Sequence, residues 1–167
     1  MTRIPARAGL FGVCAFFLLS SPHAAQRTFV STGGSDANAC SLVAPCRGFA
    51  KAITVTDPEG EIIALDSGGY GSVIVNKNVT IVSPAGVYAG ISVFAATDGI
   101  TVAAPATRVV LRGLTVNGQG GTHGVRIQSG EVHVESTIIS NMARAFDLAA
   151  LRWPARDDEQ EQCHYSK

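Results

Sequence analysis

The side chains of this chain that could act together lie between residues 112 and 135. His133 and Glu135 are two positions apart in an alternating segment, so they share one face, and Arg112 falls beside them when the repeats described below are aligned. Such a set could bind a sugar or a metal ion. The same residue types are also common as a solvated ladder with an exposed ion pair, which contributes little to stability. We expect the ladder role and keep ligand binding as the alternative.

His123 and Arg126 form a second candidate binding pair, three positions apart in one short segment. Acid–base chemistry on a glycosidic bond would require a pair of carboxylates beside them. No acidic cluster can be assembled from the segments that align, because the aspartates of residues 26–150 are far apart in the sequence: they are Asp36, Asp57, Asp66, Asp98 and Asp147. The sequence therefore assigns no catalytic residue and disfavours enzymatic activity.

A calcium ion is the one cofactor worth weighing, because Asp36 and Asn38 follow Gly33-Gly34 as they would in a calcium-binding loop. Loops of that kind work in repeated copies, and this one occurs once. We expect an ordinary turn here, no metal centre and no cofactor.

Two stretches in the second half of the chain repeat with nearly the same period. Val109-Val110-Leu111-Arg112 aligns with Val132-His133-Val134-Glu135 at an offset of 23 residues (132 − 109), which pairs Arg112 with Glu135. Val125-Arg126-Ile127 aligns with Phe146-Asp147-Leu148 at an offset of 21 (146 − 125), which pairs Arg126 with Asp147. A period of ~20 to 25 residues that contains several short alternating strands is typical of a solenoid.

Short strands separated by turn-forming residues extend this pattern back to residue 61. Gly, Asn and Pro interrupt the alternation at each break, as in Asp66-Ser67-Gly68-Gly69 and Ser83-Pro84-Ala85-Gly86. The chain has 18 glycines and only 16% charged residues, which favours turns and strands over long helices. We predict an all-β, right-handed parallel β-helix over residues 61–150. Asn117 and Asn141 each close a strand, and they are equally compatible with a stacked amide ladder and with two ordinary turns.

Residues 1–25 have the layout of a secretory signal peptide. Two arginines precede an apolar run over residues 8–19, and small residues follow it. The run is too short to span a bilayer, so no membrane span is expected after its removal. Without the two arginines the chain has 11 basic and 13 acidic residues, and this near-neutral balance argues against nucleic acid as a partner. We predict a secreted or periplasmic protein.

Residues 26–60 are expected to form a disulfide loop and a capping helix. Cys40 and Cys46 are close together, and in an oxidising compartment a local disulfide is their expected state. Phe49, Ala52 and Ile53 follow at helical spacing, with Lys51 opposite. We predict a helix of two to three turns that ends before Pro58 and covers the first coil, since solenoid ends need caps.

Residues 151–167 differ from the rest, with no glycine, no alternation and a block of acids. The segment is either a polar capping tail or the product of a lost reading frame, and we favour the second because a third coil begins at Ala145-Phe146-Asp147-Leu148 and then stops. A solenoid interrupted there would expose an apolar end coil and could self-associate through it. Cys163 lies in this segment.

The quoted features together resemble a known group of proteins. Over residues 26–148, the cysteine loop, the helix segment, Gly68-Gly69-Tyr70-Gly71 and Leu111-Arg112-Gly113-Leu114-Thr115 are similar to exported bacterial right-handed parallel β-helix proteins of the pectin-lyase-like superfamily. This resemblance implies the fold and a polysaccharide as the partner. The superfamily includes polysaccharide lyases, glycoside hydrolases and proteins without known activity.

The residues depart from the catalytic patterns of that superfamily. Polygalacturonases have separated Gly-His-Gly and Arg-Ile-Lys motifs with an aspartate pair, whereas here His123-Gly124 and Arg126-Ile127-Gln128 are adjacent, Gln replaces Lys, and the pair is missing. We therefore expect a non-catalytic carbohydrate- or surface-interaction module. A lyase or hydrolase and a self-associating structural protein or adhesin are the alternatives.

Overall fold

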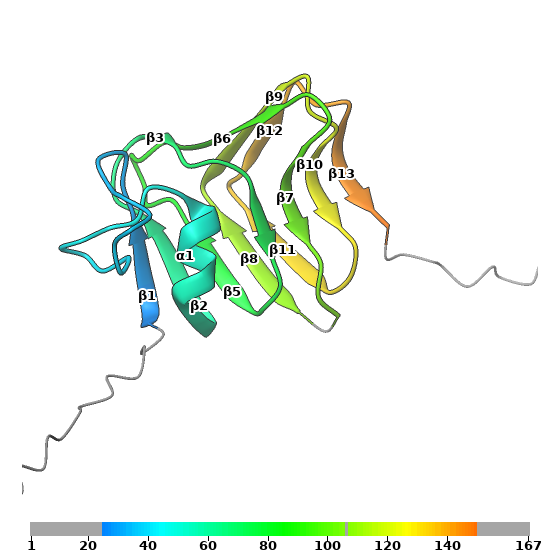
Figure 1. Cartoon of the computed structure of the whole chain (residues 1–167). Helices are drawn as coiled ribbons and strands as arrows, with labels where there is room; N and C mark the ends of the chain where they lie inside the picture. Colours follow the sequence, from blue (N-terminus) through cyan, green and yellow to red (C-terminus); the bar gives the residue numbers. More distant parts are fainter. Residues whose placement is uncertain (1–24, 106, 150–167) are drawn as a thin grey trace, which may run out of the picture.

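Three parallel β-sheets and one short helix make up the part of the chain that the computed structural model describes, residues 25–105 and 107–149 (Figure 1). Sheet A contains β1 (Ala25–Val30), β2 (Thr56–Ala64), β5 (Val79–Val82), β8 (Arg108–Arg112) and β11 (Glu131–Glu135). Sheet B contains β3 (Gly68–Gly69), β6 (Ala89–Phe94), β9 (Leu114–Gln119) and β12 (Ile138–Ser140). Sheet C contains β4 (Val73–Val75), β7 (Asp98–Val102), β10 (His123–Ile127) and β13 (Arg144–Leu148). The helix α1 is Phe49–Val55.

From β2 onward the chain passes through sheets A, B and C in turn, four times over. Each strand pairs in parallel with the equivalent strand of the next coil, which is the architecture of a parallel β-helix. The predicted all-β solenoid is therefore confirmed. Residues 1–24, which hold nearly all of the predicted signal peptide, and residues 150–167, which hold the predicted tail and Cys163, lie outside the described residues.

Both alignments made from the sequence are strand registers in the structure. Val132 pairs with Val109 and Glu135 with Arg112 between β11 and β8. Asp147 pairs with Arg126 between β13 and β10. The repeat was visible there because these coils have similar lengths, whereas the step from Val79 to its partner Val109 is 30 residues (109 − 79).

The expectation that residues 145–148 begin a new coil is wrong. They belong to β13, the last strand of the fourth coil, which pairs with β10 in sheet C. Every coil starts in sheet A, so a fifth coil would begin beyond β13.

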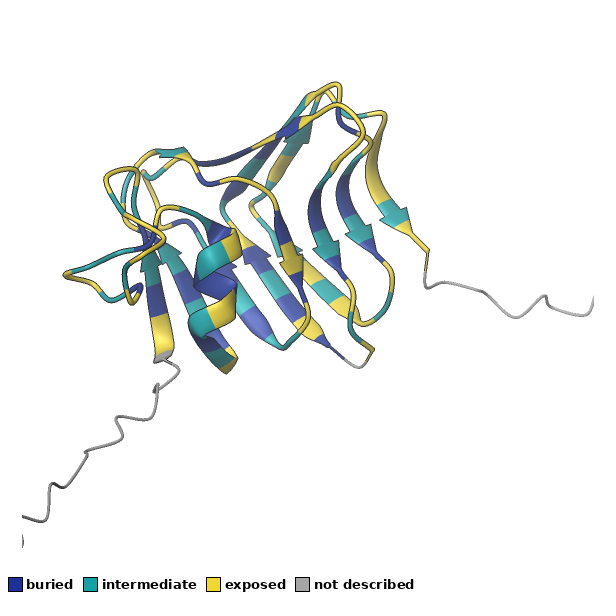
Figure 2. Cartoon of the chain, viewed as in Figure 1, coloured by how far each residue is buried: buried dark blue, intermediate teal, exposed yellow. Residues whose placement is uncertain are grey.

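The core is a stack of inward-facing aliphatic side chains, one layer per coil. In sheet A, Ile62, Ile81 and Leu111 are fully buried and follow one another in register. In the fourth coil the inward positions lose this cover, and Phe146 and Leu148 are 44% and 48% exposed. Figure 2 shows the change from buried to exposed colouring towards β13. The described part of the β-helix is thus closed at its first coil and open at its last.

The predicted helix is confirmed and covers the first coil. Its buried residues are Phe49, Ala52 and Ile53, as the spacing indicated, and the helix packs against β1, β2 and β4. The ring of Phe49 lies 5.2 Å from that of Tyr70, centroid to centroid. The helix thus removes from water the apolar end that the first coil would otherwise present.

The cysteine loop holds the start of this helix. Cys40 and Cys46 form the predicted disulfide, and both are buried. Asp36 accepts hydrogen bonds from the backbone N–H groups of Arg47 and Gly48 at 2.9 and 3.1 Å, just before the helix begins. The Asn38 side chain donates to the carbonyl of Pro45 at 2.8 Å. Asp36 and Asn38 therefore have structural partners, as expected for a turn.

The first coil starts earlier than the sequence suggested. β2 begins at Thr56 and continues through Pro58 and Gly60, whereas the sequence predicts a loop at these two residues. The strand accommodates them because the pairing with β1 shifts between Ala25 and Arg27, and Glu59 adopts a positive φ of 64°. At such a bulge the residue does not need to donate a backbone hydrogen bond to the neighbouring strand, so Pro58, which has no N–H, is tolerated.

The predicted amide ladder is also present. The Nδ2 of Asn141 donates to the Oδ1 of Asn117 at 2.8 Å. Asn141 has a φ of 55°, so it is a turn residue as well. Asn117 lies inside β9, so the ladder interpretation holds for both asparagines and the turn interpretation only for Asn141.

Asp66 ties the first coil to the strand before it. Its carboxylate accepts hydrogen bonds from the Ser31 hydroxyl at 2.8 Å, from the Thr32 backbone N–H at 2.9 Å and from the Tyr70 hydroxyl. The hydrogen bond from Tyr70 is the main reason that the pKa of Asp66 falls from 3.8 to about 2, although burial acts in the opposite direction. Ionised Asp66 therefore stabilises the fold.

We expect this group to contribute to acid sensitivity. Its pKa is lower in the folded state than in the unfolded state, so its stabilisation is present above pH 3.8 and is lost as the pH falls towards about 2. Replacing Asp66 with Asn should lower the free energy of unfolding at pH 7. The variant's free energy of unfolding should also decrease less than that of the wild type between pH 3.8 and about 2. Urea denaturation at a series of pH values measures both effects.

The variant Tyr70→Phe serves as the matched control, because it keeps the ring against Phe49 and removes only the hydroxyl. Its pH dependence should fall between those of the wild type and Asp66→Asn. Identical acid profiles for the wild type and Asp66→Asn would show that Asp66 has no such role.

Candidate functional site

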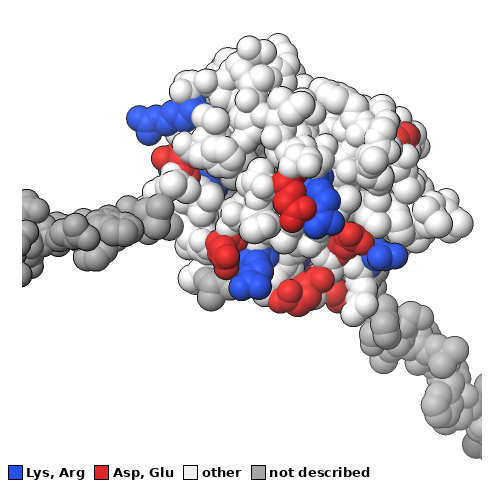
Figure 3. Space-filling view, turned by 180° about the vertical axis from the view of Figure 1, so that it is seen from behind, with Lys and Arg blue, Asp and Glu red and all other residues white. Residues whose placement is uncertain are grey.

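The outer faces of the three sheets differ in charge. Charged pairs join successive coils on sheet A: Arg27 with Glu61 at 3.1 Å, Arg108 with Glu131 at 3.4 Å, and Arg112 with Glu135 at 2.7 Å. The four strands of sheet B contain no charged residue. In Figure 3, acidic and basic side chains alternate over the lower part of the visible side, and the upper part is almost entirely uncharged.

Three of the predicted site residues lie on sheet A. Arg112 donates from Nε to Glu135, and His133 Nε2 lies 3.8 Å from the other carboxylate oxygen. The side chains of Arg112 and His133 are half or more exposed. The hydrogen bond from Arg112 lowers the pKa of Glu135 and raises that of Arg112. This geometry is that of the solvated ladder expected from the sequence.

The other two predicted residues, His123 and Arg126, lie on sheet C in a denser group of charges. We call this group the sheet C cluster, and it consists of Asp98, His123, Arg126, Arg144 and Asp147. His123 Nδ1 is 2.7 Å from Asp98 Oδ1, and its Nε2 is 3.6 Å from Asp147 Oδ2. Arg126 also reaches both carboxylates, at 3.3 Å to Asp98 and 3.4 Å to Asp147. The five predicted site residues therefore divide between two separate sheets.

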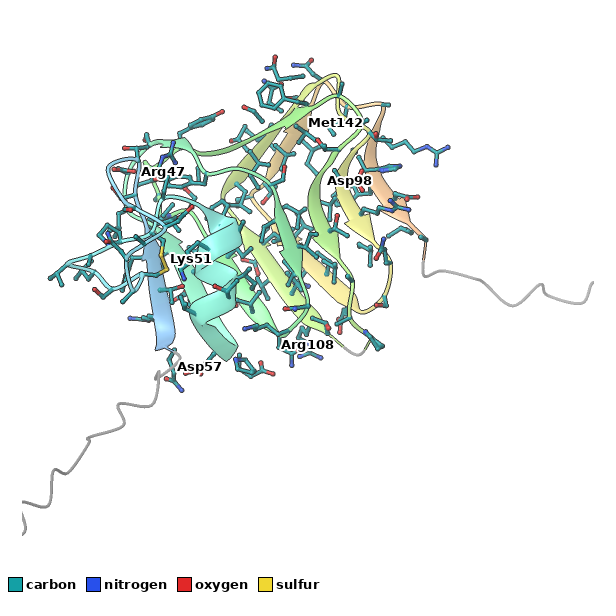
Figure 4. All side chains as sticks on the ribbon, in the orientation of Figure 1. Arg47, Lys51, Asp57, Asp98, Arg108 and Met142 are labelled. Carbon is teal, nitrogen blue, oxygen red and sulfur yellow. A yellow bond between two sulfur atoms is a disulfide. The ribbon has the colours of Figure 1, made fainter. Side chains whose placement is uncertain are left out.

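Three members of the sheet C cluster, His123, Asp98 and Asp147, are more protected from water than the paired side chains on sheet A. The side chains of His123 and Asp98 are only 12% and 17% exposed. Burial raises the pKa of Asp98, but the hydrogen bonds with His123 and Arg126 outweigh it and leave the pKa below its usual value. Asp98 is thus held as a carboxylate between His123 and Arg126; Figure 4 labels Asp98 on sheet C.

Close packing at this corner of the coil brings the cluster together. Gly99 and Gly124 each follow a cluster residue, and a Cβ on Gly99 would lie 2.6 Å from the carbonyl oxygen of Gly124. A Cβ on Gly124 would lie 2.7 Å from the carbonyl of Ala145. Glycine therefore lets β7, β10 and β13 stack with Asp98, His123 and Arg144 at equivalent positions.

A groove of about 840 Å³ lies between α1 and the outer face of sheet C and ends at this cluster. Its lining comprises Ala50, Ile53, Thr54, Ser72, Val73, Ile74, Asn76, Lys77, Thr97, Asp98 and Thr101. Ile74 is 65% exposed, and its register partner in β7 is Thr101. Thr101 pairs in turn with Arg126 of β10, so a row of outward side chains leads from the groove into the cluster.

The structure brings two of the five aspartates to the same pair of basic side chains, a grouping that the sequence alignment did not indicate. Asp98 and Asp147 are far apart in the sequence, but both contact His123 and Arg126. The missed signal is a third copy of a motif: Asp98-Gly99-Ile100-Thr101-Val102 matches His123-Gly124-Val125-Arg126-Ile127 at an offset of 25 residues (123 − 98).

Within residues 25–105 and 107–149, no group of three or more His, Cys, Asp or Glu side chains has a geometry that could hold a metal ion. The basic members of the sheet C cluster lie between its carboxylates. The sheet C cluster thus presents hydrogen-bonding and charged groups beside the groove.

We expect the two arginine pairs to differ in their effect on stability. Arg126→Ala should lower the free energy of unfolding by about 2 kcal/mol, because it removes one of the two partners that the partly buried carboxylates of Asp98 and Asp147 share. Arg112→Ala is the matched control on sheet A, and it should change stability little and in a salt-dependent way. Chemical denaturation of both variants measures the difference, and equal losses would contradict this ranking.

Comparisons of the chain with protein-family models, with curated proteins and with solved structures gave no match.

Proposed function

We propose that this chain is an exported β-helix protein of the pectin-lyase-like superfamily and that it binds polysaccharide without cleaving it. The observation that carries this proposal is the groove between α1 and sheet C. Its hydroxyl, amide and charged groups lie beside exposed aliphatic surface, a combination suited to sugar rings, which present hydroxyls on their rims and C–H groups on their faces. The alternating coils and the cap helix support the superfamily assignment.

Export is supported by the apolar run over residues 8–19 and by the Cys40–Cys46 disulfide, since disulfides persist mainly in oxidising compartments. In the described segments, none of the helices has the length and apolar character needed to cross a membrane.

The groove offers contacts for an acidic sugar chain. Ser72, Asn76, Thr97 and Thr101 provide hydroxyl and amide groups, and Lys77 provides a positive charge. The Lys77 ammonium donates to the carbonyl of Thr56 at 2.9 Å, which uses one of its three donors. Two donors are left for a sugar carboxylate.

Pairing within the sheet C cluster favours binding over catalysis. Each carboxylate contacts both His123 and Arg126, so neither is poised as a separate acid or base. An enzyme is the second candidate, a polysaccharide lyase or glycoside hydrolase, because two carboxylates, a histidine and an arginine gather next to the groove, where Asp98 is part of its lining.

Blocking the groove should abolish binding of an acidic polysaccharide. Ile74→Glu places a bulky negative charge on its floor, and we expect at least a tenfold loss of affinity for polygalacturonate oligosaccharides, measured by isothermal titration calorimetry. Ile138→Glu is the matched control, because Ile138 is 62% exposed on sheet B, close to the 65% of Ile74. Equal losses in the two variants, or no binding by the wild type, would refute the groove as the site.

Incubating the protein with uronate polysaccharides and measuring the products distinguishes a binding protein from an enzyme. We expect no unsaturated product and no new reducing ends from uronate polysaccharides. Turnover that is lost in Arg126→Ala but kept in Arg112→Ala would establish the enzyme instead, with the sheet C cluster as its site.

The open fourth coil favours self-association as a further function, in a structural protein or an adhesin. Phe146 and Leu148 occupy inward positions but are nearly half exposed, and among the described residues β11, β12 and β13 are the last strands of their sheets. Apolar side chains beside unpaired strand edges are a recurrent basis for association.

We expect the chain to form a concentration-dependent dimer that Phe146→Ser together with Leu148→Ser disrupts. Sedimentation velocity over a range of concentrations tests this. Val43→Ser is the control, because Val43 is 94% exposed in the cysteine loop, away from the open coil. A monomer at all concentrations would rule out association through this end.

A further inference from the structure

Sheet B presents an outer face that the groove and the sheet C cluster do not involve. Its strands contain no charged residue, whereas ion pairs cross the outer faces of sheets A and C. The strand register defines its outward rows: Gly90 with Thr115 and Ile138, then Ser92 with Asn117 and Ser140, then Phe94 with Gln119. The middle of the face is therefore made of hydroxyl and amide side chains.

Two exposed aromatic side chains lie at the two ends of β6 on this face. Phe94 is 65% exposed and Tyr88 is 49% exposed. The Tyr88 ring lies over Gly90, where an added Cβ would be 2.7 Å from the ring atom Cε1. Six residues of extended chain place the backbones of Tyr88 and Phe94 roughly 20 Å apart.

The polar groups between the rings are fixed in position. Asn117 accepts the hydrogen bond from Asn141 through its Oδ1, which orients its amide so that Nδ2 remains as a donor. Ser92 is exposed beside it. A sugar chain offers C–H faces and hydroxyl rims. The aromatic rings can stack on the faces, and the oriented amide and hydroxyl groups between the rings can bind the hydroxyls.

We propose that the outer face of sheet B binds a neutral polysaccharide that lies along β6, with stacking on Tyr88 and Phe94 and hydrogen bonds to Ser92 and Asn117. The absence of charge on these strands selects the ligand: Arg47 reaches only the β3 edge, where it donates to the carbonyl of Gly69 at 2.7 Å, and the row from Ser92 to Phe94 offers a uronate carboxylate no cationic partner in exchange for its water. A neutral glycan has no such cost. This site is independent of the groove and does not require the function proposed for it.

A second copy of the chain fits this face less well. Stable protein interfaces centre on a contiguous apolar core, and here the two rings are separated by polar side chains. The exposed apolar surface of the fourth coil, at Phe146 and Leu148, lies on inward positions and is a different feature.

The test measures affinity of the full chain for cellohexaose, a neutral β-glucan, by isothermal titration calorimetry. The wild type should bind, and binding should not weaken as salt is raised, because no ion pair is involved. Tyr88→Ala combined with Phe94→Ala should lose at least tenfold in affinity. Tyr88→Phe combined with Phe94→Tyr keeps both rings and should bind like the wild type.

Two controls separate this site from the groove. Ile74→Glu should retain cellohexaose binding while it loses polygalacturonate, and the double alanine variant should show the reverse. Both aromatic side chains are exposed, so the melting temperature of the double variant should match that of the wild type.

The proposal is overturned if the wild type does not bind cellohexaose, if the double alanine variant binds as tightly as the wild type, or if binding weakens steeply with salt. It is also overturned if the double alanine variant changes the mass measured by sedimentation, because the face would then be an interface between copies.

Discussion

The vertical stacking of apolar side chains from one coil to the next is the interaction on which the rest of this structure depends. Ile62, Ile81 and Leu111 follow one another at buried, register-paired positions, and each layer keeps water from the next. Parallel backbone hydrogen bonds run in the same direction as this stack. Because each coil rests on its neighbours, stability is shared along the solenoid and is weakest where a neighbour is missing.

The two ends of the described β-helix handle that weakness differently. At the first coil, α1 buries Phe49, and the disulfide loop and the hydrogen bonds of Asp36 hold the start of the helix. At the fourth coil, Phe146 and Leu148 have buried partners on one side only. The same inward pattern thus gives a closed end where the helix covers it and an exposed apolar surface where none of the described residues does.

Alternate side chains of each strand point away from the core, so they need not be apolar. Each sheet can therefore carry its own surface chemistry. Sheet A carries solvated ion pairs, sheet C carries a partly buried charge cluster at the end of a groove, and sheet B carries hydroxyls, amides and two exposed rings. One scaffold therefore presents three faces with different surface chemistry, and a change on one face need not disturb the others.

The sequence by itself determined the local periodicity and therefore the fold class, because alternation and repeat length are properties of short segments. It also predicted the cap helix from the spacing of Phe49, Ala52 and Ile53, the disulfide from cysteine proximity, and the pairing of Arg126 with Asp147 from one alignment. Only the tertiary structure decided the number of coils, because the long step from Val79 to Val109 hid the earlier repeats. It also decided that Asp98 belongs to the cluster with His123, since a contact between coils depends on how three strands stack at glycine-lined corners. Local pattern fixes which side chains face outward, but their neighbours across the coils are set by register over the whole solenoid.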